Sequence, residues 1–174
     1  MNNLVFSSVI TKKLKKKEIL SICKLKNTYW KYGVKSQLKW FSENIKKNDI
    51  HNLVHLKKKL IGYNLLRKRT FLIKKSKFFY LYFDTLIVMK KYRKIKIGHQ
   101  LCSFILSIIK DSKLHSMLIC EKKSVSFYKK YKWKKIKKNM FKILDHKYPE
   151  KYSGMFINQS KAVSKNKVQY FVYV

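Results

Sequence analysis

The stretch IVMKKYRKIKIGHQL, Ile87 to Leu101, joins an apolar run to a basic cluster and then to the start of an amphipathic pattern. The apolar run closes a longer segment, Lys77 to Met89, whose aromatic and β-branched residues predict a strand. Downstream, one helix face is outlined by Leu101, Phe104, Ile105, Ile108 and Ile109. The stretch therefore predicts a strand, a basic turn and a helix in succession.

The basic turn, Arg93 to His99, has two interpretations of equal weight. The N-terminus of a helix presents unpaired backbone N–H groups and the positive end of the helix dipole, so the turn can wrap a pyrophosphate. Alternatively, it is a solvated turn in which Gly98 serves as a conformational joint. The segment alone does not decide between an anion site and a surface loop.

The rest of the chain supplies further predicted elements of both kinds. The expected helices are Lys15–Lys26, Gln37–Ile45 and Lys122–Tyr131. The expected strands are Leu4–Ile10, a hairpin from His51 to Phe71 with its turn near Lys57–Lys59, His115–Cys120, and the segments WKKI, MFKIL and VQYFVYV. Polar residues from Gln159 to Lys167 predict a mobile loop. This order indicates an α/β (α+β) fold with a mixed sheet in a single domain, residues 1–174.

The net charge of +35 is typical of a nucleic-acid-binding protein. However, only three of the 43 basic residues are arginine, and the chain has one alanine and one proline. The abundant residues have AT-rich codons, so an AT-rich genome that makes lysine the default surface residue accounts for the charge. The charge still favours anionic ligands, but we expect no specific nucleic-acid partner.

Three cysteines, Cys23, Cys102 and Cys120, lie far apart in apolar patterns. An odd count without a CxxC pair argues against a disulfide framework, and the three thiols are expected in the core. No Cys/His set has the spacing of metal ligands. No run reaches the ~20 apolar residues that span a bilayer, so we expect a cytoplasmic protein without a membrane partner.

The segment YRKIKIGHQL resembles the acetyl-CoA pyrophosphate loop of the GNAT superfamily of N-acetyltransferases. That loop reads Arg/Gln-x-x-Gly-x-Gly/Ala at a strand-to-helix turn. Arg93 matches its first position and Gly98 its last, whereas Lys96 stands at the middle glycine. A side chain at this position must point away from the ligand or bring its ammonium group to the phosphates.

Downstream, SVSFYKKYKW, Ser124 to Trp133, resembles the second GNAT signature, an Asn followed by a small residue and then Phe-Tyr-x-x-x-Gly-Phe. Phe127 and Tyr128 match directly. Ser124 replaces the Asn, and Lys132 replaces the Gly. The two signatures occur in the expected order on a strand–helix–strand–helix frame.

The resemblance implies a mostly antiparallel sheet flanked by about four helices, with strands splayed at the acetyl-CoA site. It implies acetyl-CoA as donor and a primary amine, on a small molecule or a protein, as the acceptor that attacks the thioester directly. Val88 would donate its backbone N–H to the thioester oxygen near a bulge. The implied cofactor-binding residues are Leu86, Ile87, Val88, Arg93, Lys94, Lys96, Ile97, Gly98, His99 and Ser124.

Two residues are candidates for proton transfer. By its motif position Tyr128 is the candidate general acid, although its helical spacing also fits a core aromatic. Asp84 interrupts an apolar strand, where a carboxylate needs a partner or a cleft. It is either a general base or amine-binding group, or the partner of a lysine. Ser124 either contacts the pantetheine or caps a helix.

The acceptor contacts are less defined. Three aromatic residues lie between the first two predicted helices: Tyr29, Trp30 and Tyr32. They either stack on an acceptor or, as we favour, pack on the sheet. His51 and His55 either touch the acceptor or are ordinary strand residues.

Three functions are therefore open: an N-acetyltransferase acting as monomer or homodimer, a basic nucleic-acid-binding protein, and a degenerate GNAT-fold protein without catalysis.

Overall fold

The computed structural model describes residues 4–73, 76–137, 141–143, 151–157 and 170–172. The chain divides into two compact units. The first unit consists of Met1–Arg67 and Asp84–Ile105, and the second of Lys68–Phe83 and Leu106–Val174. The single domain expected for residues 1–174 stays a prediction, and each unit is described in turn.

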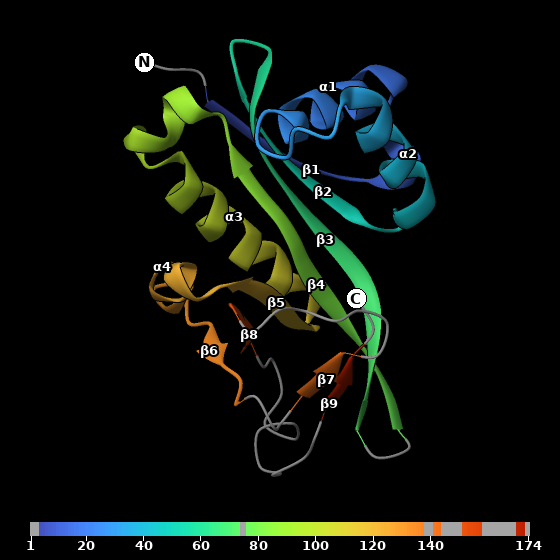
Figure 1. Ribbon diagram of the computed structural model, residues 1–174, viewed down its shortest axis with the longest axis vertical. Coiled ribbons are helices and arrows are strands. Elements are labelled where there is room, and N and C mark those ends of the chain that lie inside the picture. The colour runs from blue at the N-terminus through green and yellow to red at the C-terminus, as the bar shows by residue number, and fades with distance from the viewer. Residues whose placement is uncertain (1–3, 74–75, 138–140, 144–150, 158–169, 173–174) are drawn as a thin grey trace. The chain divides into compact units, whose positions relative to one another are not determined.

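The first unit combines three strands and two helices with the end of a fourth strand and the start of a third helix (Figure 1). Its complete elements are β1 (Leu4–Ile10), α1 (Lys16–Asn27), α2 (Val34–Asn44) and β2 (Ile50–Leu56). Parts of three long elements also belong to it: β3 (Lys59–Ile73), β4 (Ser76–Val88) and α3 (Ile97–Ser112). A 3-10 helix, Lys90–Ile95, joins β4 to α3.

The strands β1, β2 and β3 pair antiparallel in chain order. The β2–β3 hairpin turns at Lys57 and Lys58, whose φ angles of 47° and 64° suit a tight two-residue loop. The predicted hairpin and its lysine turn are therefore confirmed. The pairing of β2 with β3 shifts register between Val54 and His55, which marks an irregularity near the hairpin end.

Apolar residues of α1, β2, β3 and β4 form the core of the first unit. The fully or nearly fully buried members are Ile22, Leu25, Leu53, Leu60, Tyr63, Leu65 and Ile87. The two early helices lie side by side in Figure 1, and α1 buries its apolar face against these strands. On α3, Phe104 packs on Phe6 of β1, with 5.7 Å between ring centroids.

The second unit contains the first half of β4 and the strands that follow α3. The complete elements are β5 (His115–Glu121), α4 (Val125–Lys129), β6 (Lys134–Lys135), β7 (Phe141–Ile143), β8 (Tyr152–Ile157) and β9 (Tyr170–Val172). Tyr80–Phe83 of β4 pair in parallel with His115–Leu118 of β5. Phe71, Tyr80, Tyr82 and Met117 form its buried core.

Within the described residues, hydrogen-bonded strands follow the order β1-β2-β3-β4-β5-β8-β6, with β9 pairing to β3 and β7. Most pairings are antiparallel, while β4–β5 and β7–β9 are parallel. The predicted mixed, mostly antiparallel sheet with about four helices is confirmed.

Three details differ from the expectations. The strand β8 was not expected, because Gly154 and a neighbouring serine lower its strand propensity, yet it pairs with β5 along six residues. The α-helix expected over 122–131 is shorter, since a 3-10 turn precedes α4. The expected loop from Gln159 to Lys167 lies outside the described residues. No helix in the described part of the chain has the length and apolar character needed to cross a membrane.

Candidate functional site

The last five residues of β4, Asp84 to Val88, depart from regular strand geometry. Asp84 pairs with Arg67, and Ile87 belongs to the core that contains Tyr63 and Leu65. Because Tyr63, Leu65 and Arg67 alternate along β3, they share one face of the sheet. Asp84 and Ile87 therefore reach the same face although three residues separate them. Such a break in alternation is what a β-bulge produces, and it lies where the resemblance implied one.

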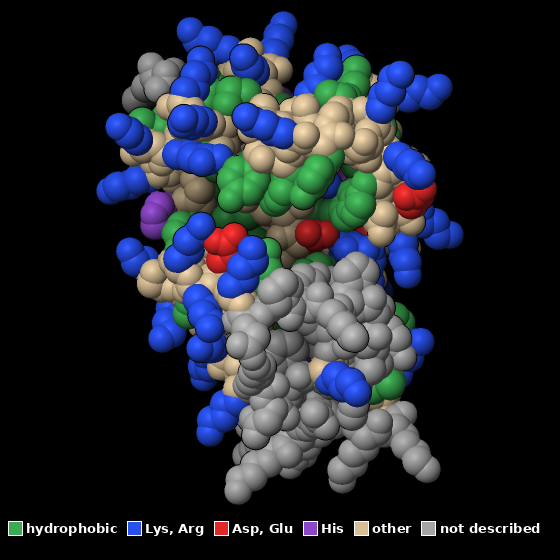
Figure 2. Space-filling view, in the orientation of Figure 1, with side chains coloured by type: hydrophobic (Ala, Val, Ile, Leu, Met, Phe, Trp, Pro, Cys, Tyr) green, Lys and Arg blue, Asp and Glu red, His purple; other side chains and the backbone are tan. Residues whose placement is uncertain are grey.

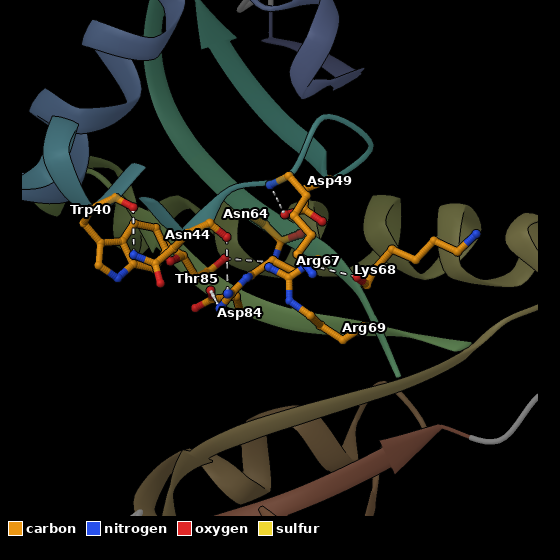
Figure 3. A network of polar contacts seen from close by, with 10 residues as sticks. Trp40, Asn44, Asp49, Asn64, Arg67, Lys68, Arg69, Asp84 and Thr85 are labelled. Atoms are coloured by element: carbon orange, nitrogen blue, oxygen red, sulfur yellow. Dashed lines mark hydrogen bonds and ion pairs between the residues drawn. The ribbon is translucent and has the colours of Figure 1, made fainter. Parts of the chain in front are cut away.

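On the face that carries α2, an ion pair holds Asp84. Arg67 Nη1 lies 3.2 Å from Asp84 Oδ2, and Arg67 Nη2 donates to the carbonyl of Asn44 over 3.4 Å. The Arg67 side chain is nearly buried and that of Asp84 is 21% exposed. Figure 3 shows the two groups pointing toward each other from β3 and β4. This contact favours the ion-pair interpretation of Asp84, with arginine in place of the expected lysine.

A second cation, Lys26 of α1, belongs to the same face. Only 6% of Lys26 is exposed, and its Nζ lies 3.6 Å from the centroid of the Trp40 ring. Burial lowers the pKa of Lys26 to about 8, and the negative charge of Asp84 partly offsets this shift. Removing an ammonium group from water is costly, so the aromatic face and the carboxylate both stabilise it.

On the opposite face, two buried asparagines form a hydrogen-bond chain to β4. Asn52 Nδ2 donates to Asn64 Oδ1 over 2.9 Å, and Asn64 Nδ2 donates to the carbonyl of Thr85 over 2.8 Å. Both asparagines are fully buried. Asn52 Oδ1 has no hydrogen-bond partner among the described residues, an arrangement that costs about 1–3 kcal/mol.

The basic segment after β4 is a 3-10 helix that ends at a left-handed residue. Lys96 has φ 59° and ψ 18°, a conformation that glycine adopts without cost. α3 begins immediately afterwards at Ile97, so Gly98 and His99 lie in its first turn rather than in the preceding loop. A Cβ atom on Gly98 would lie 3.9 Å from Val88 Cγ2, an ordinary contact distance. Lys96, which stands at the middle glycine of the motif, therefore has the left-handed backbone that glycine favours.

A cavity of about 240 Å³ lies beside the irregular end of β4. It is lined by Tyr29, Leu86, Ile87, Val88 and Arg93. Arg93 Nε donates to the carbonyl of Val88 over 3.0 Å, and its guanidinium carbon lies 5.7 Å from the centroid of the Tyr29 ring. These contacts join the loop after α1, the end of β4 and the start of the basic segment around one hollow.

Four of the predicted cofactor-binding residues, Leu86, Ile87, Val88 and Arg93, are thus brought together. The other five of the first unit follow in the adjoining turn and the start of α3: Lys94, Lys96, Ile97, Gly98 and His99. Tyr29 lines the cavity although packing was the favoured interpretation. Trp30 does pack on the core, and Tyr32 is 73% exposed. The sequence contained no signal that separated these three neighbours.

Two predicted site residues, Ser124 and Tyr128, belong to the second unit. Tyr128 is 9% exposed, and its ring packs edge-on against Phe83 and Trp133 with centroid distances of 5.7 and 6.5 Å. Ser124 occupies the N-cap position of α4 without a side-chain capping hydrogen bond. Lys132, at the second motif glycine, has φ 64°.

His51 and the three cysteines are structural. His51 is fully buried between Thr11 Oγ1 at 2.9 Å and the hydroxyl of Tyr63 at 2.8 Å. Burial, followed by the charge of Lys26, lowers the pKa of His51 to about 4. All three cysteines are buried, and burial raises the pKa of Cys102 to about 12. Such thiols are poor nucleophiles.

The surface charge follows the composition. In Figure 2 the lysine and arginine side chains are spread over the face in view instead of gathering into one stripe. Acidic groups are few on this face. A field of this kind favours polyanionic ligands in general.

Comparisons with known proteins agree with this arrangement. A family model described as an acetyltransferase (GNAT) domain matches residues 14–143. A comparison with curated proteins finds no match.

Three solved structures share the fold at low sequence identity. A GNAT family N-acetyltransferase (YhbS) from Escherichia coli in complex with CoA is 11% identical, with a TM-score of 0.72, over 99% of this chain and 90% of the other. An acyl-CoA N-acyltransferase from Pseudomonas aeruginosa is 14% identical, with a TM-score of 0.66, over 88% and 99%. Arabidopsis thaliana Naa50 with the bisubstrate analogue CoA-Ac-MVNAL is 19% identical, with a TM-score of 0.57, over 87% and 96%.

Proposed function

The chain belongs to the GNAT acetyltransferase family, and we propose that it transfers the acetyl group of acetyl-CoA to a primary amine. The observation that carries the proposal is the cavity at the end of β4, which is lined by Leu86, Ile87, Val88 and Arg93, four of the predicted cofactor-binding residues. The relatives with CoA-containing ligands, YhbS and Naa50, support acetyl-CoA as the donor.

The residues at this end of β4 fit an acyl-CoA. A pantetheine arm is long and mostly apolar, and Leu86, Ile87 and Val88 offer it an apolar wall with strand backbone. The diphosphate requires backbone N–H groups at a tight turn. The left-handed Lys96 and the helical turn that starts at Ile97 provide that geometry. Arg93, Lys94 and Lys96 add positive charge.

When bound, acetyl-CoA supplies a thioester whose acetyl group passes to the amine, while CoA leaves as the thiol and the amine loses a proton. The backbone N–H of Val88 is proposed to stabilise the charge that develops on the thioester oxygen. Ile87 and Leu86 exclude water from the reacting centre.

The reaction needs one group that donates a proton to CoA and one that accepts a proton from the amine. Tyr128 is proposed, from its motif position, to protonate the leaving thiolate of CoA, which then departs as the thiol. Asp84 is given no part in proton transfer in this proposal, because its carboxylate forms an ion pair with the guanidinium of Arg67 at 3.2 Å. The attacking amine releases its proton to solvent in this proposal.

Tyr29 is proposed to face the acceptor, since it lines the cavity and is 53% exposed. The Naa50 structure contains an analogue with a peptide portion. A peptide N-terminus therefore joins small amines and amino sugars in the acceptor screen.

The test is a calorimetric titration with acetyl-CoA at moderate salt, with ATP as a polyanion of related chemistry. Saturable binding of acetyl-CoA that stays much tighter than that of ATP as salt is added supports the proposal and justifies the screen. Equal and salt-sensitive binding of both ligands would overturn it in favour of generic polyanion binding.

A further inference from the structure

Three features converge on Thr85, the residue directly before the cavity-lining segment of β4. Its carbonyl accepts a hydrogen bond from the side chain of Asn64, its neighbour Asp84 is held by Arg67, and the side-chain alternation of the strand breaks between Asp84 and Ile87. Arg67 and Asn64 are three residues apart on β3 and approach β4 from opposite faces. Residues 84 and 85 are thus held from both sides.

The bond from Asn64 lies where the strand is irregular. Asn64 Nδ2 donates to the carbonyl of Thr85 over 2.8 Å. The break in side-chain alternation runs from the neighbouring Asp84 to Ile87, so this carbonyl lies within the irregular stretch.

Asn52 fixes the orientation of Asn64. By donating to Asn64 Oδ1, Asn52 leaves Nδ2 of Asn64 directed at Thr85. The pair is fully buried, and it leaves Asn52 Oδ1 without a partner among the described residues. Two leucines would avoid that penalty. The amides provide what leucines cannot, a donor to the backbone of β4.

We propose that Asn52 and Asn64 are positioning residues of the acyl-CoA site, because they hold the carbonyl of Thr85 within the irregular stretch and thereby the backbone of Leu86, Ile87 and Val88. Here we take the cavity as the acyl-CoA site, so the inference rests on the proposed function. Neither asparagine touches the ligand. Their effect passes through one carbonyl to the three residues that follow it, as supporting contacts do for binding residues elsewhere.

The second unit offers a matched control on the same strand. Ser116 Oγ donates to the carbonyl of Leu81 over 2.7 Å, and Ser116 is fully buried. This bond is also a buried side-chain contact to a β4 carbonyl. It lies four residues before Thr85, however, in the part of the strand that pairs regularly with β5.

The experiment compares Asn64→Leu and Ser116→Ala with the wild-type chain, by thermal unfolding and by calorimetric titration with acetyl-CoA. Both variants are expected to unfold at lower temperature. Only Asn64→Leu is expected to weaken acetyl-CoA binding, by about tenfold, the equivalent of one hydrogen bond. Ser116→Ala should change the Kd by less than about twofold.

If Asn64→Leu does not fold, Asn52→Leu tests the inference instead. This variant removes the hydrogen bond to Asn64 Oδ1 but keeps Asn64 Nδ2 as the donor to the carbonyl of Thr85. Its expected loss is about threefold in Kd. Equal Kd values for wild type and the folded asparagine variant would overturn the inference and leave the proposed function intact. A wild-type chain that does not bind acetyl-CoA would overturn both.

Discussion

The two halves of β4 have opposite characters. Tyr80 to Phe83 pair in register with β5, and three of these four side chains are packed in aromatic or apolar contacts of the second unit. Asp84 to Val88 break the alternation, and side chains of β3 bond to the carboxylate of Asp84 and the carbonyl of Thr85. One strand thus contains a regular stretch and an irregular stretch that individual side chains contact.

The difference shows where the strand is available to a ligand. Regular pairing consumes backbone donors and acceptors, so a regular strand has little left for recognition. At the irregular end, Asn64 and Arg93 donate to the carbonyls of Thr85 and Val88, and the cavity lies there. Changes in the regular half should therefore affect stability, and changes in the irregular half should affect binding.

The largest effect is expected at Gly98. A Cβ fits there, because it would lie 3.9 Å from Val88 Cγ2, but an indole would fill the approach to the turn. We expect Gly98→Trp to weaken acetyl-CoA binding by roughly 100-fold or more, and Gly98→Ala to change it little. Titration calorimetry measures both, and undiminished binding by Gly98→Trp would move the phosphate site away from this turn.

Tyr128 tests whether the regular half is purely structural, since its ring packs on Phe83 of that half. If its hydroxyl protonates the leaving thiolate, Tyr128→Phe lowers kcat by roughly 100-fold. The ring contacts remain, so the Kd for acetyl-CoA and the unfolding temperature should stay close to wild type. Steady-state rates with the best acceptor found in the screen provide the measurement. An unchanged kcat would mean that Tyr128 is a core residue without a catalytic role.

Lys26, which lies on the same face as Asp84, makes the free energy of unfolding depend on pH. Its pKa falls from 10.5 to about 8 on folding, so between these values the unfolded chain holds a proton that the folded chain lacks. The stability from this group is present above pH 10.5 and lost as the pH falls through 8. We expect wild type to gain about 3 kcal/mol relative to Lys26→Met from pH 8 to pH 10.5.

Urea unfolding of wild type and Lys26→Met at both pH values measures this gain. A difference that does not vary with pH would mean that Lys26 keeps its proton throughout the range, and that Trp40 and Asp84 stabilise the ammonium fully.

The smallest effect concerns the aromatic wall of the cavity. Tyr29→Ala removes the ring beside Arg93, and we expect acetyl-CoA to bind about two- to fivefold more weakly, as for the loss of a cation–π contact. Tyr32→Ala, in the same segment but 73% exposed, is the control and should bind as wild type does. Equal losses in both variants would point to the loop as a whole and not to the cavity wall.

Much of this architecture follows from local patterns. The apolar run before Met89 and the helical spacing after Gly98 predicted β4, the basic turn and α3, because these elements depend on short-range periodicity. The β8 strand and the role of Tyr29 depend on long-range pairing, which one sequence does not reveal. A usable signal was overlooked at Asn52 and Asn64. Like Asp84, each is a polar residue within an apolar strand, which requires a buried partner.

Every non-glycine residue with positive φ in the described part of the chain is a lysine: Lys57, Lys58, Lys96, Lys113 and Lys132. Lys96 and Lys132 stand where the two GNAT signatures have glycine. Glycine adopts a left-handed backbone with the least strain. This chain has lysine in that conformation at both positions, at a conformational cost of about 1 kcal/mol for each residue. The positions of Lys96 and Lys132 are therefore compared better by backbone angle than by residue identity.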